Sequence, residues 1–246
     1  VSDYNDIEHE AGNSVFSTVL YTEFNDHKIN FIDAPGADDY IGGIISAFRV
    51  TDTALLLMHA QHGIEVGTEI QFRYCEKFHK PLVFVVNQLD HEKANFEATV
   101  EAAKSAFGNK VVVIQYPIGA GSEFKAIIDV LKMKMYKWNA SGQQEELEIP
   151  ADQKATAEEL HNTLVEAAAE NDEKLMELFF EKGSLNEDEM RKGIAAGLIN
   201  RGMFPVFCTS AEKNIGIKRL LEFTVNVLPS PNKMAAEVTT DGKKIE

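Results

Sequence analysis

Cysteine is scarce in this chain, and long apolar stretches are absent from it. The two cysteines, Cys75 and Cys208, belong to no CxxC or histidine-rich pattern, so we expect reduced, mostly buried thiols of a cytoplasmic protein. No apolar run approaches the ~20 residues that a membrane-spanning helix requires. We therefore expect no association with a membrane.

The first residues lack the features of a secreted protein. Residues 1–4 contain neither the basic cluster nor the apolar stretch of a signal peptide. An initiator methionine is also lacking, and we expect the sequence to begin inside a longer protein.

Positive charge is in short supply as well. The 24 Lys and Arg residues stand against 39 Asp and Glu, which gives a formal net charge of −15. Residues 140–190 carry most of this excess, with fifteen acidic residues and three lysines. Because an acidic surface repels phosphate backbones, we expect no RNA contact there and no sequence-specific DNA binding by the chain. The segment is either a solvated helical surface, which is the default, or a docking surface for a basic protein.

The order of apolar segments predicts an α/β protein. With 246 residues, 44% of them hydrophobic, the chain can bury a large core. Residues 16–24 and 28–32 predict an antiparallel hairpin. Further strands are expected at 53–58, 82–86, 110–116 and from 204 onward, with helices at 39–48, 65–78 and 96–107. Such alternation predicts a doubly wound, mostly parallel sheet with helices on both faces, in which 53–58 is buried on both sides.

The alternation is interrupted in the middle of the chain. Residues 127–138 predict a strand pair, and helices are expected at 154–169, 172–181 and 187–200. We interpret residues 112–203 as an inserted α+β subdomain between two parts of one main domain, 1–111 and 204–232. The polar tail, residues 233–246, is expected to be a linker toward a further domain.

Polar segments follow three of the predicted strands, where such sheets bind ligands. They are Asp33-Ala34-Pro35-Gly36, Asn87-Gln88-Leu89-Asp90 and Ser210-Ala211. The Asp90 carboxylate can accept from both N1–H and the exocyclic amine of guanine, Asn87 can tie its loop to neighbouring loops, and a backbone N–H near Ala211 can donate to guanine O6. Asp33 can hold Mg²⁺ through water, and the Gly36 N–H can donate to a phosphate. Each segment alone is more often a turn or a helix cap, but their order favours a guanine-nucleotide site.

Together these segments resemble the later motifs of translational GTPases. They are preceded by Glu10-Ala11-Gly12-Asn13-Ser14-Val15, which resembles that family's switch segment. The segments Pro117-Ile118-Gly119, Ile127-Ile128-Asp129-Val130-Leu131 and Met133-Lys134-Met135-Tyr136 are similar to the inserted subdomain of elongation factor G, and Leu228-Pro229-Ser230-Pro231 is similar to the end of its nucleotide domain. The resemblance covers nearly the whole chain. It implies a fold of the P-loop GTPase type.

The chain departs from that family at several functional positions. The phosphate-binding loop, GxxxxGK[ST], is absent, which predicts weak or undetectable GTP binding by the chain alone. Ser14 stands where the family has a Mg²⁺-binding threonine, and polar Asn13 replaces an apolar gate beside the attacking water. Ala37 stands at the position of the catalytic histidine, a loss that typically costs ~10²–10⁴ in rate. Gln88 replaces a lysine that stacks on the base.

The resemblance also implies ligands and partners. GTP or GDP is expected, with Mg²⁺ held by Ser14 and Asp33. The implied nucleotide contacts are Asp33, Ala34, Pro35, Gly36, Ala37, Asn87, Gln88, Asp90, Ser210 and Ala211. The expected partner is the ribosome, whose stalk protein the acidic subdomain would face, and the chain is expected to be a monomer.

Three interpretations of function stay open. The first is a GTP-binding elongation factor that acts in ribosomal translocation with weakened or lost hydrolysis. The second is a conventional ribosome-stimulated GTPase, and the third is a ribosome-binding module that does not use nucleotide. Ala37 and Asn13 favour the first over the second, whereas Asp90 and Ser14 argue against the third. His59 and His62 are the candidates to replace the missing histidine, although an ordinary surface loop is the favoured interpretation of that segment.

Overall fold

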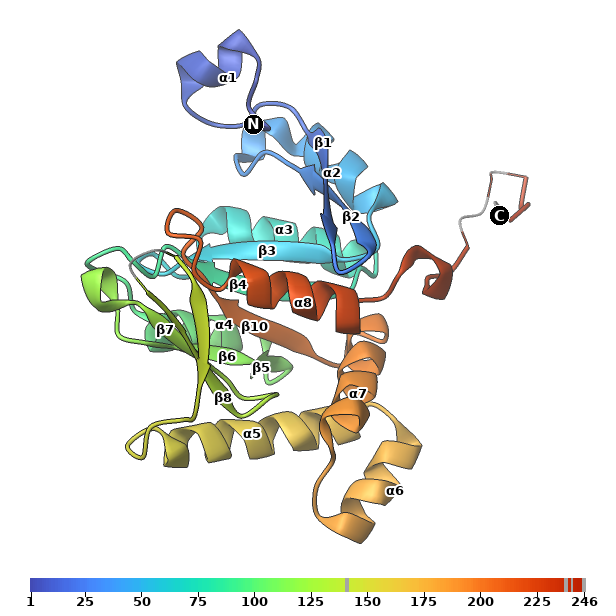
Figure 1. Ribbon diagram of the computed structural model, residues 1–246. Helices are drawn as coiled ribbons and strands as arrows, with labels where there is room; N and C mark the ends of the chain where they lie inside the picture. Colours follow the sequence, from blue (N-terminus) through green and yellow to red (C-terminus); the bar gives the residue numbers. More distant parts are fainter. Residues whose placement is uncertain (140–141, 237–238, 240, 245–246) are drawn as a thin grey trace.

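The structure, a computed structural model, describes residues 1–139, 142–236, 239 and 241–244 (Figure 1). Its strands are β1 (Thr18–Phe24), β2 (His27–Asp33), β3 (Ala54–His59), β4 (Leu82–Asn87), β5 (Val111–Val113), β6 (Gln115–Ile118), β7 (Ala126–Asp129), β8 (Lys134–Trp138), β9 (Gln144–Leu147) and β10 (Phe204–Cys208). Its α-helices are α1 (Asp6–Ala11), α2 (Ile41–Val50), α3 (Val66–Lys77), α4 (Phe96–Phe107), α5 (Lys154–Ala169), α6 (Glu173–Lys182), α7 (Glu187–Ile199) and α8 (Ile217–Val227).

A four-stranded parallel sheet forms the centre of the molecule. Its strand order is β3-β4-β10-β5, and every neighbouring pair is parallel. Helices α3 and α4 lie on one face of this sheet and α8 lies on the other (Figure 1). Phe84 of β4 stacks on Phe107 of α4 at 5.2 Å, whereas Phe207 of β10 meets Phe223 of α8 at 4.6 Å. Side chains alternate between faces along a strand, so the apolar runs cover both sides, which confirms the predicted doubly wound α/β class.

The predicted hairpin is present as a separate two-stranded sheet. Strands β1 and β2 pair antiparallel from Thr18 opposite Asp33 to Phe24 opposite His27. Strand β3 is therefore the edge strand of the parallel sheet. The prediction that residues 53–58 are buried on both faces is wrong at Leu57, which is 57% exposed, because an edge strand is covered less completely than a central one.

The inserted segment begins with a change of sheet. The single strand predicted over 110–116 is two strands, because β5 pairs with β10 whereas β6 pairs antiparallel with β7. Ile114 joins them, since its N–H donates to Val206 and its carbonyl accepts from Val130, both at 3.0 Å. This change lies close to the predicted boundary at 112, and the domain division itself stays a prediction.

The rest of the inserted segment follows the predicted pattern closely. The expected strand pair is β7 and β8, and the three expected helices are α5, α6 and α7. Strand β9 extends this antiparallel sheet and was not expected, and neither was the short helix α1. The acidic side chains of α5 and α6 are mostly exposed, as those of a solvated helical surface are.

A buried ion pair connects this antiparallel sheet to α8. Arg219 of α8 donates to Asp129 at the end of β7 over 3.0 Å, and the two side chains are only 5% and 4% exposed. The same guanidinium lies 4.1 Å from the ring centre of Tyr136 on β8. The pair holds the inserted segment against the helix that follows β10.

The C-terminal tail lies partly outside the described residues. The linker predicted over 233–246 includes 237–238, 240 and 245–246, for which no structure is described. Of the helices that the structure describes, none combines the length and apolar character needed to cross a bilayer.

Candidate functional site

Two loops that are far apart in the sequence meet at the carboxyl end of the parallel sheet. Because β4 and β10 are parallel neighbours, with Cys208 opposite Val86, the segments that follow them leave the sheet side by side. The Thr209 N–H donates to the Val86 carbonyl at 2.8 Å, and the Leu89 N–H donates to the Thr209 carbonyl at 3.3 Å. The sheet thus places residues 87–90 against residues 209–212.

Asn87 locks these two loops together. Its Oδ1 accepts from the Thr209 hydroxyl at 3.1 Å and from the Ala211 N–H at 3.0 Å. The interpretation of Asn87 as a tie between neighbouring loops is confirmed by these two hydrogen bonds. The Ala211 N–H therefore donates to another group of the protein in this structure.

Ser210 has a structural task in the same loop. It is fully buried, its Oγ accepts from the Lys213 N–H at 3.2 Å, and its backbone exchanges two hydrogen bonds with Ile215, each of 3.0 Å. These bonds shape the turn before α8. The predicted contacts of Ser210 and Ala211 with a nucleotide stay predictions.

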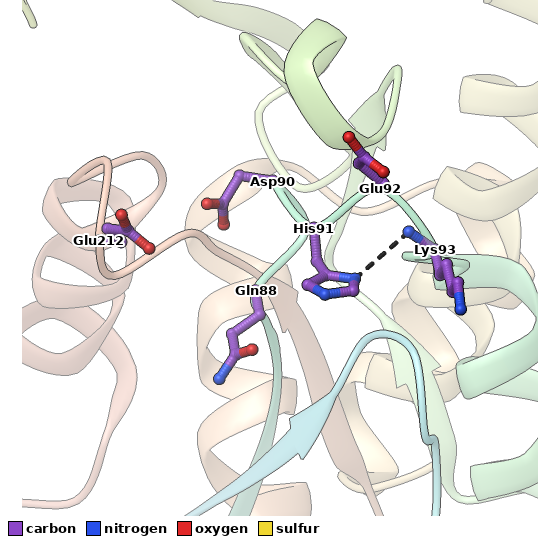
Figure 2. Close-up of a pocket in the computed structure, with 6 residues that line it drawn as sticks. All are labelled: Gln88, Asp90, His91, Glu92, Lys93 and Glu212. Atoms are coloured by element: carbon purple, nitrogen blue, oxygen red, sulfur yellow. Dashed lines mark hydrogen bonds between the residues drawn. The ribbon is translucent and has the colours of Figure 1, made fainter.

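A pocket of about 270 Å³ opens beside the joined loops. It is lined by Gln88, Asp90, His91, Glu92, Lys93 and Glu212. Figure 2 shows the Asp90 carboxylate turned toward the loop that carries Glu212, whereas the Gln88 side chain points downward in this view, away from Asp90. Leu89, between them, is fully buried and its carbonyl accepts from the Gly121 N–H at 2.9 Å, which anchors the loop under Asp90.

The charge of this pocket suits a neutral, donor-rich ligand. Three carboxylates, those of Asp90, Glu92 and Glu212, outnumber the single cation, Lys93. Like charges repel, so the pocket disfavours phosphate groups, whereas N–H donors of a base edge are attracted by carboxylates. None of residues 91–93 and Glu212 was among the predicted site residues. Residues 91–93 directly follow Asp90 in the sequence, whereas Glu212 reaches the pocket from the other loop.

The second predicted motif lies on the separate hairpin. Asp33 ends β2, and the turn continues through buried Pro35 and exposed Gly36. A Cβ placed on Gly43 of α2 would lie 2.8 Å from the Ser17 Oγ and 3.7 Å from Pro35 Cδ, so the glycine lets α2 approach this turn. Ala37 precedes the short 3₁₀ helix Asp38–Tyr40 in an extended conformation and offers only a methyl group. Asp33 to Ala37 do not line the pocket of Asp90.

The segment that carries Ser14 is organised by a buried carboxylate. Glu8 of α1 is 1% exposed. One of its oxygens accepts from the N–H groups of Val15 and Phe16, both at 3.1 Å, and the other accepts from the backbone and side chain of Asn5. The Val15 hydrogen bond, despite the opposing effect of burial, contributes most to lowering the pKa of Glu8 to about 2. Sequence reasoning missed Glu8, since an acidic residue in a polar stretch carries no signal of burial.

We expect Glu8→Gln to loosen residues 1–17. Hydrogen bonds to a charged acceptor are the strong ones, so the Val15 and Phe16 amides should exchange about tenfold faster or more in hydrogen–deuterium exchange. Because the pKa of Glu8 is lowered from 4.5, its stabilisation is complete above pH 4.5 and is lost as the pH falls toward 2. Glu10→Gln, at an exposed position, is the control. Equal exchange in both variants would contradict the anchoring role.

The predicted Mg²⁺ ligands are Ser14 and Asp33. The Ser14 hydroxyl donates to the Asp3 carboxylate at 2.7 Å, and Asp33 pairs with Thr18 across the hairpin. No cluster of three His, Cys, Asp or Glu among the described residues is arranged to hold a metal ion. The roles of Ser14 and Asp33 stay predictions.

The candidate replacement histidines lie beside the loop that follows β4. The His59 ring is 4.5 Å from the ring of His62 and 6.0 Å from that of His91, measured between centroids. His59 ends β3 and is the register partner of Asn87. No contact of Ala37 with this cluster is seen among the described residues. His91 was not predicted to belong to the group.

Comparison with known proteins shows a family and a solved structure to which this chain is similar. The model of the elongation factor Tu GTP binding domain matches residues 1–230, which include every predicted site residue. Among solved structures, the chain is similar to the protein ttk003000868 from Thermus thermophilus, with a TM-score of 0.87 and 29% identity over 94% of this chain. The chain spans about a third of that protein's length, 34%.

Proposed function

Because the chain belongs to the family of elongation factor Tu GTP-binding domains, we propose that the pocket beside β4 and β10 binds the guanine base of GTP or GDP. The observation that carries this proposal is the pair of hydrogen bonds from Thr209 and Ala211 to Asn87. They join the two loops beside the pocket that Asp90 lines. A rigid carboxylate there selects the guanine edge, whose N1–H and amine both donate, over adenine, whose N1 is an acceptor.

The remaining nucleotide contacts belong to the proposal as well. The Asp33 carboxylate and the Ser14 hydroxyl would hold Mg²⁺, which supplies charge neutralisation of the phosphates when bound. The exposed Gly36 has open space around it, so its N–H is accessible to a phosphate oxygen. Gln88 and Ala34 to Ala37 complete the proposed contacts.

The cellular role that we propose is that of a cytoplasmic elongation factor acting in ribosomal translocation as a monomer. Hydrolysis of GTP would be weakened or lost, because Ala37 has no group that can orient water or transfer a proton. Asn13 is exposed and polar, where an apolar side chain would exclude water. The exposed carboxylates of α5 and α6 provide an acidic surface for the ribosomal stalk protein.

Asp90→Ala tests guanine recognition directly. We expect the variant to bind GDP at least tenfold more weakly and to lose its preference for GDP over ADP, since each hydrogen bond to a charged group is worth about 1.5–3 kcal/mol. The measurement is equilibrium competition between GDP and ADP for a fluorescent GDP analogue, using the intact protein.

Glu97→Ala is the matched control for this experiment. Glu97 is an exposed carboxylate in the first turn of α4, and its removal should leave both affinities unchanged. If Asp90→Ala and Glu97→Ala behave alike, the pocket does not read the guanine edge, and the proposal is wrong.

A further inference from the structure

The inserted segment reaches the proposed guanine pocket through the loop between β6 and β7. This loop contains Gly119 and the 3₁₀ turn Gly121–Glu123. In Figure 2 the turn, drawn in light green, lies directly above Glu92. A Cβ placed on Gly121 would lie 3.4 Å from the Glu92 Cα and 3.6 Å from the His91 carbonyl oxygen. The turn therefore packs against the backbone of two residues that line the pocket.

The backbone of Leu89 is held by this turn and by the loop after β10 at the same time. Its N–H donates to the Thr209 carbonyl at 3.3 Å, and its carbonyl accepts from the Gly121 N–H at 2.9 Å. Its side chain is fully buried, so Leu89 has little freedom to move. Because Asp90 is the next residue, the place of its carboxylate depends on both contacts.

The direction of the Gly121 N–H is fixed by the shape of the loop. Gly119 and Gly121 have left-handed backbones, with φ of 78° and 61°, which only glycine adopts readily. A Cβ on Gly119 would lie 2.7 Å from the Glu123 carbonyl oxygen, which is too close for two unbonded atoms. The Phe124 N–H donates to the Gly121 carbonyl at 3.2 Å, and the Phe124 side chain is buried. The turn is thus anchored in the core.

The inserted segment also supports the second loop of the pocket, through α8. Ser210 exchanges two backbone hydrogen bonds with Ile215 just before α8 begins. Arg219, in the first turn of α8, donates to Asp129 at the end of β7 over 3.0 Å. Strand β7 follows the 3₁₀ turn directly. Residues 119–129 therefore hold both of the loops that Asn87 joins.

We propose that Gly121 is a positioning residue for guanine recognition: the β6–β7 loop fixes Leu89, and through it Asp90, in the orientation that reads the guanine edge. This inference rests on the proposed function of the pocket. It adds that the inserted segment sets the affinity and the base selectivity of the pocket. Gly121 acts through Leu89, since the residues that line the pocket belong to the loops after β4 and β10.

Gly121→Ala tests this role. An alanine disfavours φ of 61°, so the turn has to change its backbone, and the N–H of residue 121 moves away from the Leu89 carbonyl. We expect GDP to bind about tenfold more weakly and the preference for GDP over ADP to fall by a similar factor, as the loss of one hydrogen bond allows. Equilibrium competition between GDP and ADP for a fluorescent GDP analogue measures both quantities.

Gly183→Ala is the matched control. Gly183 follows α6 with φ of 73°, and a Cβ there would meet nothing within 4 Å. The variant carries the same kind of backbone strain, but α6 lies away from the parallel sheet (Figure 1). Urea denaturation should show comparable losses of stability for the two variants, whereas the GDP affinity and the selectivity over ADP should fall only in Gly121→Ala. Equal affinity and selectivity in the two variants would overturn the proposal.

A second measurement needs no nucleotide. In hydrogen–deuterium exchange of the parent, the Gly121 amide should be protected as strongly as the Leu89 amide, and rapid exchange at Gly121 would contradict the proposed contact whether or not any variant folds. The amides of Leu89 and His91, the second of which donates to the Gln88 carbonyl at 3.0 Å, should exchange about tenfold faster in Gly121→Ala than in Gly183→Ala. Unchanged exchange of both amides would show that the turn does not hold residues 88–91.

The two proposals fail in different ways. If the parent binds GDP and Gly121→Ala binds it equally well, with the same selectivity over ADP, the positioning role is wrong and the proposed function stands. If the parent does not bind GDP, the proposed function fails and guanine recognition through Gly121 fails with it. The exchange of the Leu89 and His91 amides then still decides whether the β6–β7 loop holds the loop of Asp90.

Discussion

Asp129→Ala is expected to lower the free energy of unfolding by about 3–5 kcal/mol, because it removes the buried carboxylate that pairs with the Arg219 guanidinium and leaves that buried cation with Glu222, which is less deeply buried, as its remaining partner. One oxygen of the Asp129 carboxylate accepts hydrogen bonds from the Arg219 guanidinium at 3.0 Å and from the Gln115 side-chain amide at 2.9 Å. Its other oxygen accepts hydrogen bonds from the backbone N–H groups of Leu131 and Lys132, at 3.1 and 3.0 Å. All four donors lose their partner at once in the variant. Urea denaturation followed by circular dichroism measures the change.

The control for Asp129→Ala is a solvent-exposed ion pair that involves a strand of the same antiparallel sheet. Glu148 pairs with Lys134 of β8 while 83% of its side chain is exposed, so Glu148→Ala should cost no more than about 1 kcal/mol. The double variant Asp129→Leu with Arg219→Met should recover much of the loss, since neither buried charge remains. Equal losses for Asp129→Ala and Glu148→Ala would contradict the assignment of this pair as the joint between β7 and α8.

The central sheet could be predicted from the sequence because its strands differ clearly from their surroundings. Leu82 to Val86 is a short apolar run between polar loops, and a strand of that kind has to be covered on both faces. The two loops that join at Asn87 could also be anticipated, since adjacent parallel strands bring their carboxyl ends together. The predicted tie at Asn87 agrees with that geometry, since its side chain accepts from the loop that follows β10.

The sequence pattern could not show where the chain changes from one sheet to another. Residues 111–116 are apolar apart from Gln115, and the same pattern suits one strand or two. What divides them is the pairing of Ile114 with Val206 on one side and Val130 on the other, contacts that depend on residues distant in the sequence. The position of β3 at the edge of the parallel sheet could not be predicted for the same reason, because it depends on which strands pair.

Buried polar groups were the other feature that could not be predicted from the sequence. Glu8 and Asp129 are each surrounded by donors that the local sequence does not reveal, and Arg219 lies 90 residues from the carboxylate it pairs with. The histidine cluster also depends on the fold, since His91 joins His59 only because β3 and β4 are neighbours. Each of these groups is costly to bury alone, so its presence is explained only once its partners are known.

Ala37→His is expected to raise ribosome-stimulated GTP hydrolysis by ~10²–10⁴-fold, the range that a positioned acid–base group contributes. The backbone at Ala37 has φ of −81° and ψ of 139°, an extended conformation open to any side chain. The residue is partly exposed, so an imidazole can be accommodated without displacing the core. Single-turnover hydrolysis with ribosomes is the appropriate assay.

The control for this gain is Ala37→Phe, which adds a ring of similar shape without a titratable nitrogen. If the parent and the phenylalanine variant are slow and the histidine variant is fast, the chain binds GTP but lacks the group that orients water. Rapid hydrolysis by the parent would instead mean that another group performs this task, and the interpretation of Ala37 would be wrong. His59 is not the first candidate for that role, because its Nδ1 already accepts from the Gln61 N–H. The same assay with Ser14→Ala would show whether the Ser14 hydroxyl contributes to GTP hydrolysis. That hydroxyl now donates to the Asp3 carboxylate at 2.7 Å and would have to exchange this partner for Mg²⁺.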